Sequence, residues 1–284
     1  MALVGQNLRR MITGLLTLTM AATAMAAQTT TAPVKSKTKP KVAPTKTAPA
    51  AKTPVQKTEA FTPAATPTAA PAVTKPANDT ALLEKVLDQL DKASAEFKST
   101  EADFVWDQYQ KVVDETDTQK GKVYFVRHEK DMHMAANITD PDKKDLVFSD
   151  GKLRFYQPRI DQVTEYDAGK NKAEVESFLV LGFGGRGHDL EKSFHVHFGG
   201  YETVDGVKTA KLELTPNATK IKSTFEKIIL WVDPARGVSV KQQFVEPSGD
   251  YRIAKYMNFK MNGKVSDDVF KLKTTPKTKV VKNQ

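Results

Sequence analysis

Large apolar residues alternate with polar residues along most of the chain beyond residue 100. Because successive side chains of a strand point to opposite faces, this period of two predicts β-strands. The alternating positions are Phe104/Trp106, Val123/Phe125/Arg127, Leu146/Phe148, Leu153/Phe155, Phe194/Val196/Phe198, Leu212/Leu214, Ile228/Leu230/Val232, Val238/Val240 and Ile253/Lys255/Met257/Phe259. Tight-turn sequences such as Asp150-Gly151 separate them. The pattern therefore predicts an antiparallel meander, either a barrel or a sandwich.

Two segments have helical rather than strand spacing. The first begins near Thr80, which can cap a helix. Its apolar stripe comprises Leu83, Val86, Leu87, Leu90 and Phe97. A helix with one apolar stripe must pack on another element. The second segment, Asn171–Leu181, interrupts the strands and is followed by a glycine-rich loop.

Some predicted strands carry large apolar residues on both faces. Ile229 and Trp231, for example, alternate with Ile228 and Leu230. Ordinary core packing on both faces of a sheet explains this pattern, since large apolar residues are usually buried. A sheet with one face lining a cavity explains it as well, and the pattern alone leaves both interpretations open.

The first 26 residues have the features of a secretory signal peptide. Arg9 and Arg10 precede the apolar run Met11–Ala22, and Ala24-Met25-Ala26 provides a small-residue cleavage site. The run is shorter than the roughly 20 residues that a membrane-spanning helix needs. We therefore expect export, with cleavage near Ala26.

Residues 27–78 are rich in alanine, threonine, proline and lysine and contain almost nothing large and apolar. Such a segment cannot bury enough surface to fold, so we expect a solvated linker followed by a single domain over residues 79–284. The +9 charge of the chain comes entirely from residues 1–78, because the remainder has 33 basic and 33 acidic residues. A nucleic-acid-binding domain would carry the excess charge itself, so we expect no nucleic-acid partner.

Candidate chemical motifs are few. Gly182–Gly187 matches the dinucleotide fingerprint in letters, but a helical segment precedes it and strands follow, which is the wrong context. His195 and His197 share one strand face without a third ligand, so we expect solvent-facing side chains and no metal site. The chain has no cysteine and therefore no disulfide, no Cys-zinc site and no lipid anchored on cysteine. No serine elbow, P-loop or HExxH helix is present, so we expect neither an enzyme nor a cofactor.

The ordered set of sequence segments resembles the LolA-type periplasmic carriers of outer-membrane lipoproteins. The resemblance covers residues 79–284 and includes "ADFVWDQYQ", the glycine-led strand "GKVYFVRHEKDMHM" and the hairpin "LVFSDGKLRFYQPRIDQV". It continues through "LELTP", "IILWVDPARGVSVKQQFVEPSGD" and "DDVFKLKTTPKTKVVK". The resemblance implies an α+β, mostly β fold: a strongly curved, incomplete antiparallel barrel closed by a helical lid.

The resemblance also implies a periplasmic function and its partners. Such a carrier, expected to be a monomer, receives acylated lipoproteins from an inner-membrane ABC-type releasing complex and delivers them to an outer-membrane lipoprotein acceptor. The family arginine that contacts the lid falls on Arg127. His128 stands where the family has proline, and the next apolar family position falls near Lys130 or Asp131.

For this carrier the expected acyl-chain cavity is lined by Phe104, Trp106, Val123, Phe125, Phe148, Phe155, Leu230 and Met257. The expected lid residues are Phe178, Leu179 and Leu181, with Gly182–Gly187 giving the lid freedom to move. Two alternatives stay open: a carrier or sensor of another envelope lipid, as in regulators of envelope stress, and a small-molecule enzyme on the same half-barrel.

Overall fold

The computed structural model describes residues 75–129, 131–169 and 172–283. The expected signal peptide and the linker up to residue 74 lie outside the described residues. The strands are β1 (Ser99–Gln110), β2 (Glu115–His128), β3 (Asp131–Asp140), β4 (Lys144–Ser149), β5 (Lys152–Gln157), β6 (Gln162–Asp167), β7 (Phe194–Val204), β8 (Val207–Pro216), β9 (Lys227–Asp233), β10 (Val238–Val245), β11 (Tyr251–Met261) and β12 (Lys279–Asn283). The helices are α2 (Lys75–Glu96), α3 (Lys172–Leu179) and α4 (Thr219–Lys222), with 3₁₀ turns η1 (Pro158–Ile160), η3 (His188–Lys192) and η4 (Asp267–Phe270).

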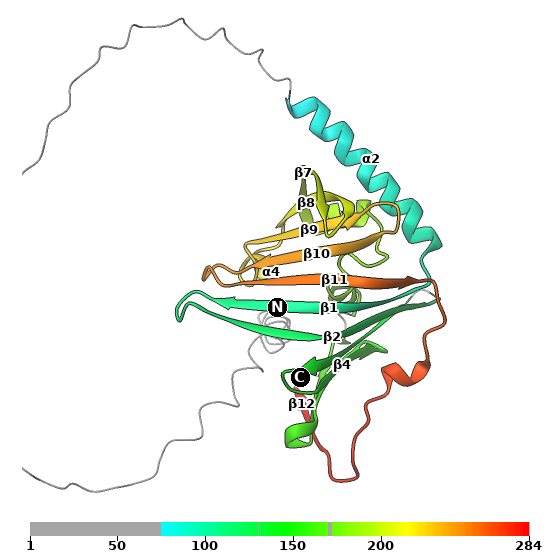
Figure 1. Ribbon diagram of the computed structural model, residues 1–284, viewed down its shortest axis with the longest axis vertical. Coiled ribbons are helices and arrows are strands. Elements are labelled where there is room, and N and C mark those ends of the chain that lie inside the picture. Colours follow the sequence, from blue (N-terminus) through cyan, green and yellow to red (C-terminus); the bar gives the residue numbers. More distant parts are fainter. Residues whose placement is uncertain (1–74, 130, 170–171, 284) are drawn as a thin grey trace, which may run out of the picture. The chain divides into compact units, whose positions relative to one another are not determined.

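The described residues form one 12-stranded sheet in the order β12-β6-β5-β4-β3-β2-β1-β11-β10-β9-β8-β7. Neighbouring strands are antiparallel except β12, which pairs parallel with β6. The sheet is strongly curved and does not close, because β12 and β7 lie at opposite edges (Figure 1). The prediction of a mostly β fold with a few helices and a strongly curved, unclosed sheet is confirmed.

The hairpin prediction at Asp150-Gly151 is confirmed. Both residues have positive φ, 54° and 71°, and Ser149 pairs with Lys152 across the turn. This conformation matches the twist of the two strands and suits Asp-Gly. Three strands, β3, β6 and β12, were not identified from the alternation, although β3 places Met132, Met134, Ala136 and Ile138 in the core at alternate positions.

Helix α2 begins earlier than the sequence predicted. It starts at Lys75, so Thr80 lies inside the helix rather than at its cap, and the linker ends before residue 78. Pro76 is compatible with this start, since the first turn of a helix leaves its N–H groups without helical partners. The predicted apolar stripe is buried, with Val86 and Leu87 fully so.

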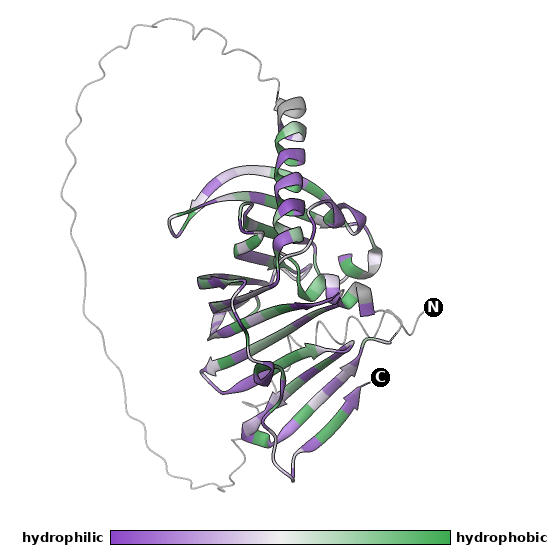
Figure 2. Ribbon diagram, turned by 90° about the vertical axis from the view of Figure 1, so that its right-hand side faces the viewer, coloured by the Kyte–Doolittle hydropathy of each residue, from purple (hydrophilic) through white to green (hydrophobic). Residues whose placement is uncertain are grey.

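The core of the protein lies on the concave face of the sheet. Strand after strand places its large apolar side chains there, which gives the alternation visible along the strands in Figure 2. The residues between helix α2 and this face, 172–193, comprise α3, the glycine-rich loop and η3, and we call them the covering segment. Phe178, Leu181 and Phe183 of this segment pack on the concave core.

A β-bulge in β11 corrects one predicted cavity residue. Asp103 pairs with Met257 but Glu101 pairs with Lys260, so β11 contains one extra residue, and Asn258 takes a positive φ of 56°. Before the bulge Ala254 and Tyr256 face the core, whereas after it the odd positions do. Met257 therefore faces outward, with 38% of its surface exposed.

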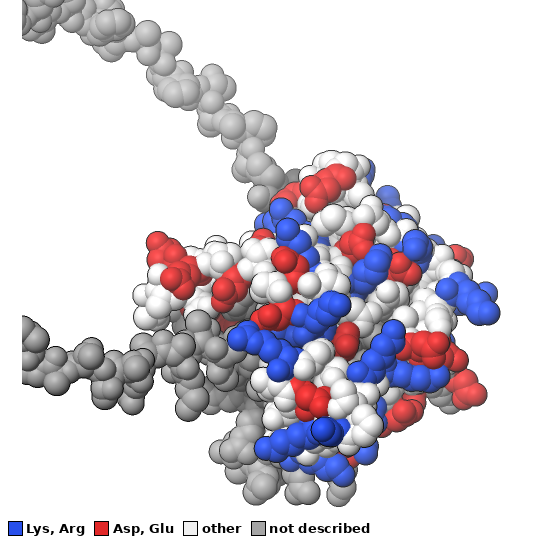
Figure 3. Space-filling model, turned by 60° about the horizontal axis from the view of Figure 1, so that its bottom comes forward, with Lys and Arg blue, Asp and Glu red and all other residues white. Residues whose placement is uncertain are grey.

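On one face of the molecule, charged side chains of both signs lie side by side. Lysine and arginine are interspersed with aspartate and glutamate on the face shown in Figure 3. Within the described residues, no helix combines the length and the apolar character needed to span a bilayer.

Candidate functional site

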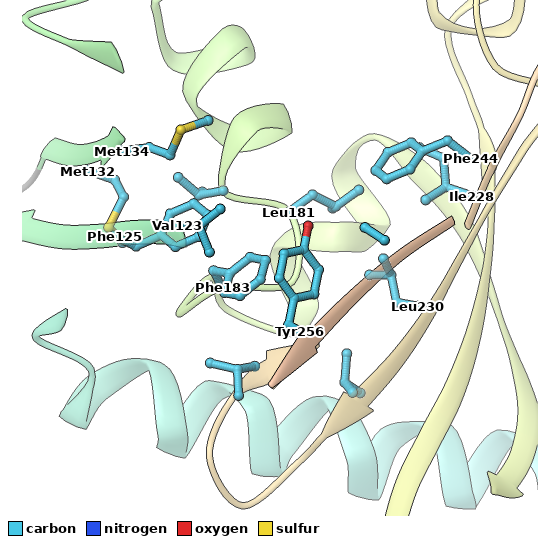
Figure 4. Packing of buried hydrophobic residues seen from close by; sticks show 14 of the residues in the cluster. Val123, Phe125, Met132, Met134, Leu181, Phe183, Ile228, Leu230, Phe244 and Tyr256 are labelled. Atoms are coloured by element: carbon cyan, nitrogen blue, oxygen red, sulfur yellow. The ribbon is translucent and has the colours of Figure 1, made fainter. Parts of the chain in front are cut away.

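Phe183 of the covering segment lies at the centre of the concave face. Its ring stacks on Phe125 of β2 with centroids 4.2 Å apart and meets the edge of Tyr256 of β11 at 4.8 Å. Figure 4 shows Phe183 and Tyr256 between the β2–β3 side of the sheet and the side formed by Ile228, Leu230 and Phe244. The covering segment is thus joined to the sheet by aromatic packing, which adds to plain area burial.

Two cavities lie against the covering segment. The larger has a volume of about 360 Å³, which is at the lower end of the range for ligand pockets. Its apolar wall comprises Leu90, Phe178, Val180, Leu181, Leu190, Phe194, Ile221, Leu230 and Val232. Arg186, Asp189 and Lys192 add charged groups to the same lining.

The smaller cavity has a volume of about 70 Å³ and lies over β1, β2, β10 and β11. It is lined by Trp106, Val123, Phe125, Met134, Ala136, Leu146, Phe178, Leu179, Leu181, Phe183, Gln242, Phe244, Arg252, Ala254 and Tyr256. Phe178 and Leu181 line both cavities and therefore form a shared wall. Phe178 also stacks on Phe225 at 5.4 Å and contacts Phe244 at 6.0 Å.

A buried chain of hydrogen bonds crosses from β11 to the covering segment. The Tyr256 hydroxyl donates to Gln242 Oε1 (3.1 Å), and Gln242 Nε2 donates to the carbonyl oxygen of Leu181 (2.6 Å). Burial raises the pKa of Tyr256 to about 12, so its phenol stays protonated and remains a donor. The chain satisfies polar groups inside an otherwise apolar region.

Arg127, the residue expected to contact the lid, lies at the end of β2 beneath the covering segment. Its Nη1 donates to the Ser94 carbonyl oxygen (2.8 Å), and its Nη2 donates to the Gly184 carbonyl oxygen (2.6 Å). The Ser94 hydroxyl donates to the same Gly184 oxygen (2.7 Å). The guanidinium also lies 5.7 Å from the centre of the Phe97 ring. Arg127 thus connects β2, the end of α2 and the glycine-rich loop.

The other end of the covering segment is held by two polar contacts with β3. The Lys172 ammonium pairs with Asp131, and the Met132 amide donates to Glu176 Oε1 (2.6 Å). Burial raises the pKa of Glu176, and the Met132 amide opposes this shift by stabilising the carboxylate. Both contacts lie at the start of β3. In the resemblance to the carrier family, the next apolar family position fell near Lys130 or Asp131, at the same point of the sequence.

The turn η3 is attached to α2 through His188. One ring nitrogen lies 3.0 Å from Asp91 Oδ2 and the other 3.3 Å from Glu84 Oε2, while Arg186 pairs with Asp91 at 3.1 Å. The hydrogen bonds to Asp91 and then to Glu84 raise the pKa of His188. Burial would raise the pKa of Asp91, but the hydrogen bonds from Arg186 and His188 lower it overall.

The glycines of this loop have a packing role that differs from the expected freedom of movement. Gly184 has a φ of +69°, and a Cβ there would lie 2.5 Å from the Phe97 ring. Its amide donates to the carbonyl oxygen of Gly237, and the Gly182 carbonyl oxygen accepts from the Ser239 amide. The loop is therefore tied to β10 and closely packed against the end of α2.

The structure distributes the expected cavity residues over three environments. Trp106, Val123 and Phe125 line the smaller cavity, as do the expected lid residues Phe178, Leu179 and Leu181. Leu230 lines the larger one. Phe104, Phe148 and Phe155 are buried on the same concave face but line neither of these two cavities. Met257 faces outward.

Other motifs lie away from the cavities. His195 and His197 are exposed on β7, opposite the buried Phe194 and Phe198, as expected. In the part of the chain that the structure describes, no group of three or more His, Cys, Asp or Glu residues is placed to hold a metal ion. The hydrophobic pattern gave no signal for Gln242, Arg252, Tyr256 or Glu176. In a sequence, a polar side chain that faces inward cannot be distinguished from one that faces solvent.

The protein thus belongs to the class of folds in which a curved, open β-sheet holds apolar cavities beneath a covering segment. Residues 95–273 match the family model described as outer membrane lipoprotein carrier protein LolA. The chain therefore belongs to the LolA family. No curated protein sequence matches the chain.

Solved structures with a similar fold have low sequence identity. The chain is similar to one chain in the structure of the Pseudomonas aeruginosa MucA/MucB complex (14% identity, 67% of this chain, TM-score 0.45). It spans 60% of that chain, less than two thirds. It is also similar to the LolA superfamily protein NE2245 of Nitrosomonas europaea (14% identity, 67% of this chain and 97% of that one, TM-score 0.35). Lipoprotein LppX of Mycobacterium tuberculosis gives 15% identity over 66% of this chain and 98% of that one, with a TM-score of 0.41.

Proposed function

We propose that the protein is a periplasmic carrier that binds the acyl chains of lipoproteins and moves them from the inner to the outer membrane. One observation carries the proposal. The wall between the two apolar cavities, Phe178 and Leu181, belongs to the covering segment and not to the sheet. Movement of that segment would join the cavities and open them while the sheet keeps its hydrogen bonds.

The energetics suit carriage rather than permanent binding. Each buried methylene contributes about 0.8 kcal/mol, and a bilayer offers an acyl chain a similar gain. A carrier between two membranes needs only to match that gain, and an incompletely filled cavity allows release. Such binding needs no covalent chemistry, so the proposal excludes an enzymatic step.

The covering segment would act as the helical lid. Opening at α3 would break the Lys172–Asp131 ion pair and the bond from the Met132 amide to Glu176, and both are partly exposed. Arg127 would couple the lid to the sheet through its bond to Gly184. Loading by an inner-membrane ABC-type complex and unloading to an outer-membrane lipoprotein acceptor would drive the two steps, with the carrier acting as a monomer.

The test is release of lipoproteins from spheroplasts. Purified mature protein added to spheroplasts should bring lipoproteins into the soluble fraction in a complex that co-purifies with it. Spheroplasts without the protein, and spheroplasts given an unrelated periplasmic protein, serve as controls. Failure of the folded protein to bring any lipoprotein into solution would reject lipoprotein carriage.

A cross-linked variant tests the lid itself. The chain has no cysteine, so Asp131→Cys with Lys172→Cys can be joined by a short thiol-specific cross-linker. We expect the cross-linked protein to lose release activity and to regain it when a cleavable linker is cut. The matched control is Lys152→Cys with Glu165→Cys, which joins the neighbouring strands β5 and β6 and leaves the covering segment unlinked. Equal release by both cross-linked proteins would reject movement of the lid.

A further inference from the structure

Arg252 places a cation in the lining of the smaller cavity. It lies on β11 on the same face as Ala254 and Tyr256, which line the cavity with it. Its guanidinium lies 5.5 Å from the centre of the Trp106 ring and 5.0 Å from that of Phe244. The two aromatic contacts hold the planar group in place and leave its N–H edge available for a ligand.

Arg252 has no direct anionic partner. Among the described residues, no ion pair or hydrogen bond to its guanidinium is present, whereas Arg154 on β5 pairs with Glu165 at 3.0 Å. Glu246, across the β10–β11 hairpin, acts on the Arg252 charge only at longer range. Burial and the nearby charge of Asp250 raise the pKa of the Glu246 carboxyl. Burial lowers the pKa of Arg252, yet an arginine remains charged. A partly buried cation without a counter-charge is unfavourable unless a ligand supplies one.

A second donor at the same cavity also lacks a partner. The Nε1 of Trp106 is buried and has no hydrogen-bond acceptor among the described residues. The indole lies close enough to Tyr256 to lower the pKa of that phenol, but the geometry does not make a regular hydrogen bond. The other polar group of the lining, Gln242, is already bonded to Tyr256 and Leu181. The cavity lining thus has two donor groups without an acceptor among the described residues, the Arg252 guanidinium and the Trp106 N–H.

We propose that Arg252 and the Trp106 N–H form a head-group site for the carboxylate or phosphate oxygens of an anionic single-chain amphiphile. The alkyl chain would continue along the apolar lining to Phe178 and Leu181, the wall shared with the larger cavity. Only a head group with acceptor oxygens and negative charge satisfies both donors, and a planar guanidinium binds such a group with two parallel hydrogen bonds. This inference goes beyond the proposed function: the acyl chains of a lipoprotein end in neutral ester or amide linkages, so the site would let the same cavities take a free anionic amphiphile as a second class of ligand.

Binding of three ligands with ten carbon atoms each separates head-group recognition from chain binding. Isothermal titration calorimetry of the full mature chain would compare decanoate, decyl phosphate and the neutral decanol. We expect the two anions to bind about tenfold more tightly than decanol, as charge-assisted hydrogen bonds allow. The tighter of the two anions identifies a carboxylate or a phosphate as the natural head group.

Arg252→Met should remove this preference while decanol affinity changes by less than about twofold, because methionine preserves apolar packing. The matched control is Lys241→Met, which removes a cation stacked at 4.1 Å on the outward-facing Trp231 and should keep the preference. Equal affinity of the wild-type protein for all three ligands, or a preference that survives in Arg252→Met, would overturn the head-group site alone. Absence of binding by all three ligands would overturn the head-group site, while the proposed function would still be decided by lipoprotein release from spheroplasts.

A measurement on the unaltered protein covers the case in which Arg252→Met fails to fold. The chain has two tryptophans, so NMR shows two indole N–H signals. The Trp106 signal should shift downfield on binding decanoate or decyl phosphate and much less on binding decanol. The Trp231 N–H already donates to Glu202 Oε2 (2.6 Å) and serves as the internal reference. A Trp106 signal that responds equally to decanol and the anions would reject the site.

Discussion

The two ends of the covering segment are attached to the molecule by different kinds of contact. At residues 182–188 the attachment is mostly buried: backbone bonds to β10, the Phe183 stack and the bond from Arg127 to Gly184. At α3 the polar attachment consists of side-chain contacts from Lys172 and Glu176 to β3, both partly exposed. Exposed polar contacts contribute little stability and open at low cost. For the movement proposed above, we therefore expect the α3 end to open first while the glycine-rich end stays in place.

The largest expected effect is at the buried end. Phe183→Ala removes a ring that is 1% exposed and stacked between Phe125 and Tyr256, so the free energy of unfolding should fall by about 3–5 kcal/mol. Urea denaturation measures this change. Phe270→Ala, on the outer side of the sheet beside His133, is the control and should cost much less. A loss below about 1 kcal/mol for Phe183→Ala would contradict a firmly attached end.

Arg127→Met should have the next largest effect. Methionine keeps most of the apolar stem but leaves the carbonyl oxygens of Ser94 and Gly184 without the charged donor, so we expect a loss of about 2–3 kcal/mol. Arg159→Met removes an exposed ion pair with Asp142 and should change the stability very little. Equal stabilities of the two variants in urea would show that Arg127 does not hold the loop.

Glu176→Gln should act locally at the α3 end. We expect a change of less than about 1 kcal/mol in the free energy of unfolding, together with faster hydrogen exchange at the Met132 amide. Because folding raises the pKa of Glu176, its contribution is fully present below the ordinary glutamate pKa of 4.5 and is lost as the pH rises through the folded value. The glutamine variant should lack this part of the pH dependence. Unchanged exchange at Met132 would contradict an anchoring role.

The smallest effect is expected at His188, which is partly exposed. Asp91 and Glu84 raise the pKa of His188, and Arg186, which pairs with Asp91, is the nearby cation. The stabilisation that His188 provides is therefore complete below pH 6.5 and is lost as the pH rises through the pKa of His188 in the folded protein. Protection of the amides of residues 185–188 against hydrogen exchange should therefore fall above pH 6.5. In His188→Gln this fall should disappear, and an identical pH profile in both proteins would exclude the histidine as its cause.

The sequence predicted most strands and the inward face of several because burial leaves a regular trace. Val123, Phe125 and Arg127 share one face in the structure, as their spacing required, and Phe104, Trp106, Phe148, Phe155 and Leu230 lie on the same concave face. The hairpin at Asp150-Gly151 was predictable from the positive φ that its turn needs.

The missed features depend on contacts between distant segments. Alternation counted across Asn258 assigned Met257 to the core, because a bulge exchanges the two faces and leaves no mark in hydropathy. Arg252 and Gln242 read as solvent-facing positions, and only the folded sheet shows that they point inward. The glycines at 182 and 184 read as a hinge, but their role is set by Phe97 and Ser239, which lie far away in sequence.

The two edges of the open sheet have a consequence for behaviour at high concentration. A long, regular edge strand invites pairing with a second molecule and hence aggregation. Here β12 is only 5 residues long and carries Lys279 and Lys282, while the β7 edge is interrupted where its pairing shifts between Phe198 and Tyr201. Short length and positive charge discourage strand addition at one edge, and the irregular backbone does so at the other. The sheet can thereby remain open at both edges without polymerising.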